Sequence, residues 1–96
     1  IALATDFNPG SCTIASLPMV MFLSMMNCGL TIDESFKGVT YNAAKSLSIE
    51  DKFGLISENY IADLLFWDID DLFEIPYWFN NNNKLKKIMK DGKFIN

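Results

Sequence analysis

The residues best suited to chemistry lie in one short segment near the beginning of the sequence. Asp6 follows a short apolar run, and the loop that it opens also contains Asn8, Gly10 and Ser11. A carboxylate at the end of a buried strand can ligate a metal ion, orient a water molecule or move a proton, and Gly10 lets the backbone approach a ligand closely. From spacing alone, the commoner use of such a residue is an Asx turn, in which Asp6 accepts from N–H groups of its own loop.

Two other groups of residues resemble functional sites by composition. Asp68, Asp70 and Asp71 form a cluster of carboxylates, but the glycine and the distant Glu of a calcium-binding loop are missing. A solvated strand end is therefore the favoured interpretation of this cluster. The run 77–79 (YWF) could stack on a ligand, yet a small β unit that closes against a larger core also needs aromatic residues. We interpret this run as core or interface.

The absence of His excludes several classes of site. The chain has 96 residues and no His, so it cannot by itself form a Ser-His-Asp or Cys-His site or a His-ligated zinc or iron centre. Ser11 has no base within this chain, and we do not interpret it as a nucleophile. If the chain takes part in catalysis, some of the groups must come from elsewhere.

Composition and charge narrow the class of protein and of partner. Half of the residues are hydrophobic, which predicts a packed core and one domain at most, or a piece of one. The net charge of −4 argues against a nucleic-acid partner. Residues 84–96 hold five of the eight Lys, but these alternate with Leu85, Ile88 and Phe94, which predicts a strand with a solvated basic face.

Cysteine usage and hydropathy point to a cytoplasmic protein without a membrane segment. Cys12 and Cys28 form no CxxC motif, so buried thiols in a reducing cytosol are expected. No signal peptide is recognisable. The most apolar stretch, 17–30, is interrupted by Ser24 and Asn27 and is shorter than the roughly 20 residues that span a bilayer. It predicts a helix buried on most sides.

The first half of the chain predicts one strand followed by helices. Residues 1–5 (IALAT) predict a buried strand that runs into the loop containing Asp6. A helix is expected from Pro18 to about residue 27, with Gly29 ending it in the left-handed conformation. The run 31–34 (TIDE) is a capping box that opens a second helix, and 41–47 predicts a third helical stretch. This order is that of a strand–helix unit in an α/β fold.

The second half predicts a small β unit. Residues 53–56 (FGLI) and 61–69 are expected to be strands, the latter buried on both faces because it is apolar almost throughout. Residues 73–79 predict an aromatic connection. Asp91-Gly92 lies between two apolar-polar runs and predicts a hairpin.

Four segments together resemble imidazolonepropionases, a family of the metal-dependent amidohydrolase superfamily. Residues 4–11 (ATDFNPGS) resemble the loop after the eighth barrel strand, and residues 39–44 (VTYNAA) resemble the helix that follows. Residues 54–64, with GLI and then ADL, are similar to the return into the small β domain shared by the superfamily. Residues 74–78 (EIPYW) resemble imidazolonepropionases in particular. The resemblance covers essentially the whole chain.

The resemblance implies an α/β fold and a place in a larger protein. Residues 1–52 are expected to be the last β/α unit of a TIM-like (β/α)8 barrel, and residues 53–96 the C-terminal part of a small β-sandwich domain. Because Ile1 opens a strand-like run without an initiator Met, we expect the chain to be the C-terminal portion of a longer protein. Ser48, Asn59 and Asn80 depart from the family, in which these positions are usually Gly.

The resemblance also implies a reaction and a role for each residue of the first loop. The family opens the ring of 4-imidazolone-5-propanoate to give N-formimidoyl-L-glutamate, a step of histidine degradation, with a hydroxide bound to one zinc or iron ion. Asp6 matches the metal-ligating Asp, which is suited to take a proton from the metal-bound water and to pass it to the departing ring nitrogen. Asn8 and Gly10 match positions that hold the propionate or product end of the ligand, and Ser11 matches a position that contacts the imidazolone.

The resemblance implies a small-molecule substrate and neither a nucleic-acid nor a membrane partner. Whether the full-length enzyme is a homodimer is left open. The HxH motif and the third His ligand of the family are absent, so this chain alone is expected to be inactive. Two alternatives also stay open: another amidohydrolase acting on a cyclic amide or by deamination, and an inactive truncated fragment.

Overall fold

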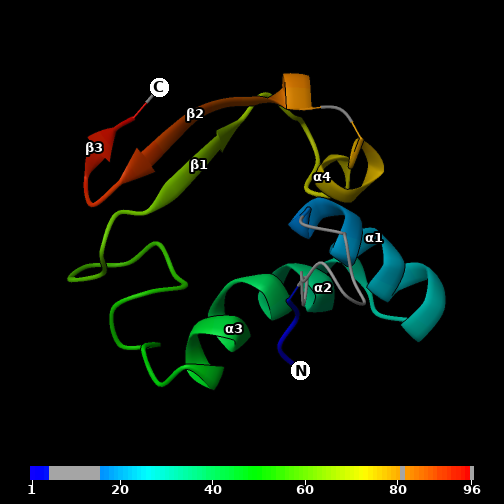
Figure 1. Cartoon of the computed structure of the whole chain (residues 1–96), viewed down its shortest axis with the longest axis horizontal. Helices are drawn as coiled ribbons and strands as arrows, with labels where there is room; N and C mark the ends of the chain where they lie inside the picture. The colour runs from blue at the N-terminus through cyan, green and yellow to red at the C-terminus, as the bar shows by residue number, and fades with distance from the viewer. Residues whose placement is uncertain (5–15, 81, 96) are drawn as a thin grey trace, which may run out of the picture.

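The computed structural model describes residues 1–4, 16–80 and 82–95. Helices α1, α2 and α3 lie along one side of the molecule and a three-stranded sheet lies along the other (Figure 1). The short helix α4 (Glu74–Tyr77) follows the first strand and contacts α1. The described residues therefore form a mixed α/β arrangement.

Helix α1 (Leu17–Cys28) begins and ends at the residues that the sequence indicates. The Ser16 hydroxyl accepts from the N–H of Met19 at 3.4 Å, and Pro18 lies in the first turn, where its missing N–H costs nothing. Gly29 ends the helix with φ of +72°. Within the described part of the chain, the search for a helix long and apolar enough to cross a membrane finds none.

Helix α2 (Ile32–Val39) opens on the expected capping box. The Thr31 N–H donates to the Glu34 carboxylate at 2.9 Å, and the Glu34 N–H donates to the Thr31 hydroxyl at 3.2 Å. Helix α2 packs on α1 through two buried hydroxyls, with Ser24 Oγ 3.0 Å from Ser35 Oγ. The Ser24 hydroxyl also donates to the carbonyl of Met21 at 2.8 Å, so this buried polar contact is satisfied.

Helix α3 (Tyr41–Ser46) follows α2 after a break at Thr40, where ψ is −93°. It ends in a Schellman motif, because the Ile49 N–H donates to the Ala44 carbonyl and the Ser48 N–H donates to the Lys45 carbonyl. Ser48 has φ of +61° and so adopts the left-handed conformation. Asn59, at +68°, does the same.

The sheet is antiparallel, in the order β1 (Leu64–Trp67), β2 (Leu85–Lys90) and β3 (Lys93–Phe94). A 3-10 turn, Asn82–Lys84, precedes β2. The predicted hairpin is confirmed, since Asp91 and Gly92 connect β2 to β3 with φ of +49° and +80°.

Two of the strand predictions are wrong, because neither segment forms a strand in the structure. Residues 1–4 form no strand, and Ile1 is 81% exposed. A strand needs a neighbouring strand, whereas the N–H of Leu3 donates to a helix carbonyl, that of Gly38. Residues 53–56 are bends and coil, because Gly54 has φ of +99° and passes directly over the start of α3. A Cβ on Gly54 would lie only 2.9 Å from Tyr41 Cα.

Three expectations about burial and local structure are also wrong. Strand β1 is not buried on both faces, since Leu65 is 54% and Phe66 39% exposed. Helix α1 leaves Met26 68% exposed, and Cys28 is an exposed free thiol. The aromatic connection contains helix α4, in which the N–H groups of Tyr77 and Trp78 donate to the carbonyls of Phe73 and Glu74.

Candidate functional site

The four predicted site residues, Asp6, Asn8, Gly10 and Ser11, lie outside the described residues. The structure describes the segments that precede and follow them, residues 1–4 and 16–80. On one flank, Leu3 donates its N–H to the Gly38 carbonyl at 2.9 Å. On the other flank, Ser16 caps helix α1. Leu3 and Ser16, on either side of residues 5–15, thus both make hydrogen bonds to helices.

A second contact fixes the first flank to α3. The side-chain amide of Asn42 donates to the carbonyl of Ile1 at 2.9 Å. Gly38 is buried beneath this segment, and a Cβ there would lie 2.9 Å from Leu3 Cγ. Residues 1–3 run beside α2 in Figure 1. Sequence reasoning missed Gly38 and Asn42; a glycine inside a helical pattern was the one available signal for a close approach.

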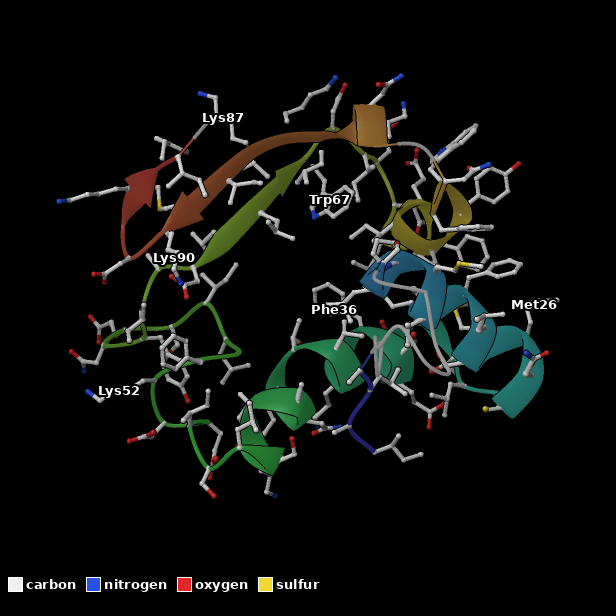
Figure 2. The ribbon with its side chains drawn as sticks, viewed as in Figure 1. Met26, Phe36, Lys52, Trp67, Lys87 and Lys90 are labelled. Carbon is white, nitrogen blue, oxygen red and sulfur yellow. The ribbon has the colours of Figure 1, made fainter. Side chains whose placement is uncertain are left out.

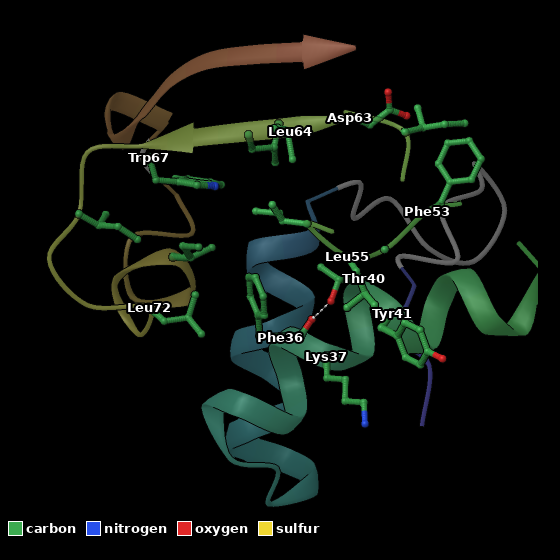
Figure 3. Close-up of a pocket in the computed structure, with 16 residues that line it drawn as sticks. Phe36, Lys37, Thr40, Tyr41, Phe53, Leu55, Asp63, Leu64, Trp67 and Leu72 are labelled. Carbon is green, nitrogen blue, oxygen red and sulfur yellow. Dashed lines mark hydrogen bonds between the residues drawn. The ribbon is translucent and has the colours of Figure 1, made fainter. Parts of the chain in front are cut away.

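A cavity of about 850 Å³ lies between the helices and the sheet. Phe36 and Leu55 line it from one side, and Leu64 and Trp67 line it from the strand β1 (Figure 3). Trp67 and Phe36 also point into the space between sheet and helices in Figure 2, whereas Lys87 points away from it. The lining is almost entirely apolar, so this cavity offers a surface for packing rather than groups for catalysis.

The few polar groups at the cavity are engaged or directed elsewhere. The hydroxyl of Thr40 donates to the Phe36 carbonyl at 2.8 Å, and Lys37 extends away from the cavity (Figure 3). The carboxylate of Asp63 accepts from the N–H of Asp91 at 2.7 Å and lies 3.7 Å from the Lys90 ammonium. Asp63 therefore fastens the turn of the β2–β3 hairpin.

The acidic cluster is structural. The Glu74 carboxylate accepts from the N–H groups of Asp70 and Asp71, at 2.9 and 3.2 Å, and the Asp71 carboxylate accepts from the N–H of Phe73 at 2.9 Å. Among the described residues, no three His, Cys, Asp or Glu side chains are grouped as metal ligands would be. Asp68, Asp70 and Asp71 are exposed, as expected for a solvated strand end.

The aromatic run 77–79 divides between core and surface. The ring of Phe79 lies 5.1 Å from that of Phe22 on α1. Tyr77 is 59% exposed and forms a T-shaped pair with Trp78 at 4.8 Å. Phe79 thus joins α1 to the segment after α4, whereas Tyr77 and Trp78 lie at the surface.

Comparison with known proteins identifies the family. A family model described as the amidohydrolase family matches residues 1–95. The chain belongs to the amidohydrolase family. A crystal structure of an uncharacterised protein shares the fold, with a TM-score of 0.64 and 18% identity over 81% of this chain and 20% of that chain.

Several curated proteins that resemble this amidohydrolase chain are named imidazolonepropionase. Imidazolonepropionases of Kosmotoga olearia and Staphylococcus saprophyticus are 38% and 39% identical over 95 residues, which are 99% of this chain and 23% and 22% of the relatives. That of Psychromonas ingrahamii is 42% identical over 89 residues, 93% of this chain and 22% of the relative. The resemblance found in the sequence is confirmed. The chain spans less than a quarter of the length of these relatives.

Proposed function

We propose that this chain is the C-terminal part of an imidazolonepropionase, which hydrolyses 4-imidazolone-5-propanoate to N-formimidoyl-L-glutamate. The observation that carries the proposal is an identity of 38–42% to proteins of that name over nearly the whole chain. The matched residues include the loop from Asp6 to Ser11. The substrate is a small molecule, and the reaction belongs to histidine degradation in the cytoplasm.

The proposal gives each half of the chain a place in the larger enzyme. Residues 1–52 would form the last β/α unit of a TIM-like barrel, and residues 53–96 part of a small β domain. The contrast between three consecutive helices in the first half and an antiparallel sheet in the second supports this division. Ligands of such barrels bind at the carboxyl ends of the strands, where Asp6 would lie.

One zinc or iron ion is the proposed cofactor, and this chain contributes only part of its ligand set. Asp6 provides a carboxylate oxygen, which is a suitable donor for either metal. The chain contains no His, so the remaining ligands must come from the part of the enzyme that has no counterpart in this chain. When bound, such an ion supplies Lewis acidity and lowers the pKa of a coordinated water.

The residues of this chain would orient the substrate and move a proton. Asp6 would accept the proton of the attacking water and deliver it to the ring nitrogen that departs. Asn8 and the bare backbone at Gly10 would donate to the propionate, since a carboxylate is held best by N–H donors. Ser11 would donate or accept at the imidazolone ring.

Replacing the proposed ligand in the complete enzyme tests the proposal. Asp6→Asn should lower kcat by orders of magnitude with an unchanged thermal melt, because the amide can neither accept the proton nor provide the anionic oxygen. Turnover of 4-imidazolone-5-propanoate and bound metal are measured together. The exposed carboxylate Asp51 supplies the control Asp51→Asn, which should match the wild type. Near-normal turnover of Asp6→Asn removes Asp6 from the mechanism.

The substrate contact assigned to Ser11 has a separate test. Ser11→Ala in the complete enzyme should raise KM several-fold and change kcat less, because one hydrogen bond to the substrate is lost in the ground state and in the transition state alike. Steady-state kinetics separates the two parameters. An unchanged KM contradicts the contact.

A further inference from the structure

Two backbone N–H groups of the β2–β3 turn bind to the segment that leads into β1. The N–H of Asp91 donates to the Asp63 carboxylate at 2.7 Å, and the N–H of Gly92 donates to the carbonyl of Ala62 at 2.9 Å. The turn lies beside the start of β1, which pairs with the end of β2 (Figure 1). A tight turn closes between its outer residues, so the N–H groups of its two central residues are available to a third segment.

The dipeptide in this turn is chemically reactive. The backbone nitrogen of the residue after an Asp can attack the Asp side-chain carboxyl carbon, and a side chain on that following residue hinders the attack. Asp91 is the one Asp in the sequence that is followed by Gly. Among the described residues, no atom beyond its chain neighbours lies within 4 Å of the position that a Cβ of Gly92 would take. Asp91 and Gly92 are both exposed, so water has access to them.

The reaction is a ring closure with loss of water. The Gly92 nitrogen forms a bond to Cγ of Asp91, the bond from Cγ to the carboxyl hydroxyl breaks, and that hydroxyl leaves with the N–H proton as water. A second water then opens the succinimide ring. Opening at Cγ restores Asp91, whereas opening at the main-chain carbonyl leaves the backbone running through Cγ, which is isoaspartate. No atom is oxidised or reduced, and water is the only co-reactant.

We propose that Asp91-Gly92 is a site of succinimide and isoaspartate formation whose rate is set by the contact with Ala62 and Asp63. The nitrogen that attacks is the one whose hydrogen is bound to the Ala62 carbonyl. Ring closure also fixes the rotation about the Cα–C bond of Asp91, whereas the two hydrogen bonds hold that bond in the turn. The reaction therefore proceeds from the opened turn, at a rate proportional to the population of that opened state.

Substitution of Asp63 removes one of the two hydrogen bonds. The Asp63 carboxylate accepts from the N–H of Asp91 and lies 3.7 Å from the Lys90 ammonium. Asp63→Ala should speed isoaspartate formation at residue 91 about five-fold, the change in the opening equilibrium that one net hydrogen bond produces. Asp63→Asn keeps an oxygen acceptor and should stay within about two-fold of the wild type.

The rate is measured on the folded protein at mildly acidic pH, where part of the carboxyl is protonated and its hydroxyl can leave. Peptide mass spectrometry with electron-transfer fragmentation separates isoaspartate from Asp at residue 91. A parallel sample in urea gives the rate of the unfolded chain, which should exceed that of the folded protein at least about 10-fold. Lys90→Gln is the control, because it removes the ion pair to Asp63 and keeps the hydrogen bond. It should change the rate by less than about two-fold.

Asp91→Asn gives a second measurement at neutral pH. Asn-Gly is favoured in the same kind of hairpin turn, and the same attack then expels ammonia in place of water. Deamidation is read as a change in mass. Adding Asp63→Ala to this variant should raise the rate by the same factor of about five. Circular dichroism checks the sheet in each variant, and a variant that has lost the hairpin is recognised by a rate equal to that in urea.

The product should have a measurable effect on the hairpin. Isoaspartate adds one carbon to the backbone between Lys90 and Lys93, which pair across the turn. The lengthened turn no longer fits this register, so β3 should separate from β2. The N–H of Ile95 donates to the Ile88 carbonyl at 3.0 Å, and its hydrogen exchange should accelerate in the modified protein.

Three results would overturn the proposal. Absence of isoaspartate at residue 91 in the unfolded chain would show that the pair is not reactive. Equal rates in the folded and the unfolded chain, or in the wild type and Asp63→Ala, would show that the contact does not set the rate. The chemistry of this turn is independent of the proposed function, so none of these results bears on the hydrolysis of 4-imidazolone-5-propanoate.

Discussion

The helices α1–α3 and the sheet β1–β3 bury their apolar residues to different extents. In the helices, Met21 is 2% exposed and Ala44 6%. In the sheet, Leu65 is 54% exposed and Phe94 52%. A helix satisfies its backbone within itself and buries a face against the next helix, whereas each face of a sheet needs a separate covering element. The helices are therefore the better-packed part of this chain.

The exposed faces of the sheet contain apolar and aromatic residues of the kind found in buried strands. On one face, the rings of Phe66 and Phe94 lie 5.6 Å apart, and the Lys87 ammonium lies 5.0 Å from the Phe94 ring. Leu64 and Trp67 of β1 line the cavity (Figure 3). Under the proposed function, the remainder of the enzyme covers these faces.

The difference in packing between helices and sheet is tested most strongly by shortening one apolar side chain in each region. Met21→Ala in α1 should lower the free energy of unfolding of this chain by about 3 kcal/mol, because a buried side chain leaves a cavity. Leu65→Ala in β1 should lower it by less than about 1 kcal/mol, because that side chain is already exposed. Urea unfolding followed by circular dichroism gives both values. Equal losses would show that the sheet is as well packed as the helices.

The contact between the segment 53–56 and α3 is tested by Gly54→Ala. The new Cβ would meet Tyr41 Cα at 2.9 Å in a backbone conformation with φ of +99°, so a loss of about 2 kcal/mol is expected. Gly29→Ala is the control, since φ is +72° and no atom lies within 4 Å of its Cβ position. It should cost about 1 kcal/mol. Thermal unfolding compares them, and an equal cost would remove the close approach from the explanation.

The end of α3 offers a stabilising change. Ser48 has φ of +61°, and relief of the left-handed strain by Ser48→Gly is worth about 1–2 kcal/mol. The additional freedom of glycine in the unfolded chain offsets about 0.4–1 kcal/mol. A net gain of about 0.5 kcal/mol is therefore expected in urea unfolding. Asn59→Gly should gain less, because Asn tolerates positive φ better than Ser. A lower free energy of unfolding for Ser48→Gly than for the wild type would contradict backbone strain at Ser48.

The smallest expected effect is the pH dependence of the α2 cap. Hydrogen bonds from the Thr31 N–H and hydroxyl lower the pKa of Glu34 below its ordinary value of 4.5. The cap therefore stabilises the fold fully above pH 4.5, and its contribution is lost as the pH falls through the lowered pKa. Glu34→Gln should flatten this part of the stability curve, whereas Glu58→Gln should not. The pKa of the Glu34 carboxyl can be measured by NMR titration. A value at or above 4.5 would contradict the hydrogen bonds between Thr31 and the Glu34 carboxylate.

The sequence by itself determined the features whose signals lie within a few residues. Pro18 and Gly29 bound α1, the pair Thr31 and Glu34 opens α2, and Asp91-Gly92 forms the hairpin turn. Each of these is a local hydrogen bond or a local backbone preference, and the sequence therefore contains all that is needed to predict it. The resemblance to imidazolonepropionases likewise came from short motifs, and it named Asp6 as the candidate ligand.

Only the tertiary structure decided the contacts between distant segments. The strand expected at 53–56 is absent because Gly54 passes over Tyr41, and the segment before Asp6 is held by Gly38 and Asn42. No periodicity within residues 1–4 or 53–56 reveals which helix they will meet. Such contacts depend on how the chain brings its elements together, and that is a property of packing rather than of any local pattern.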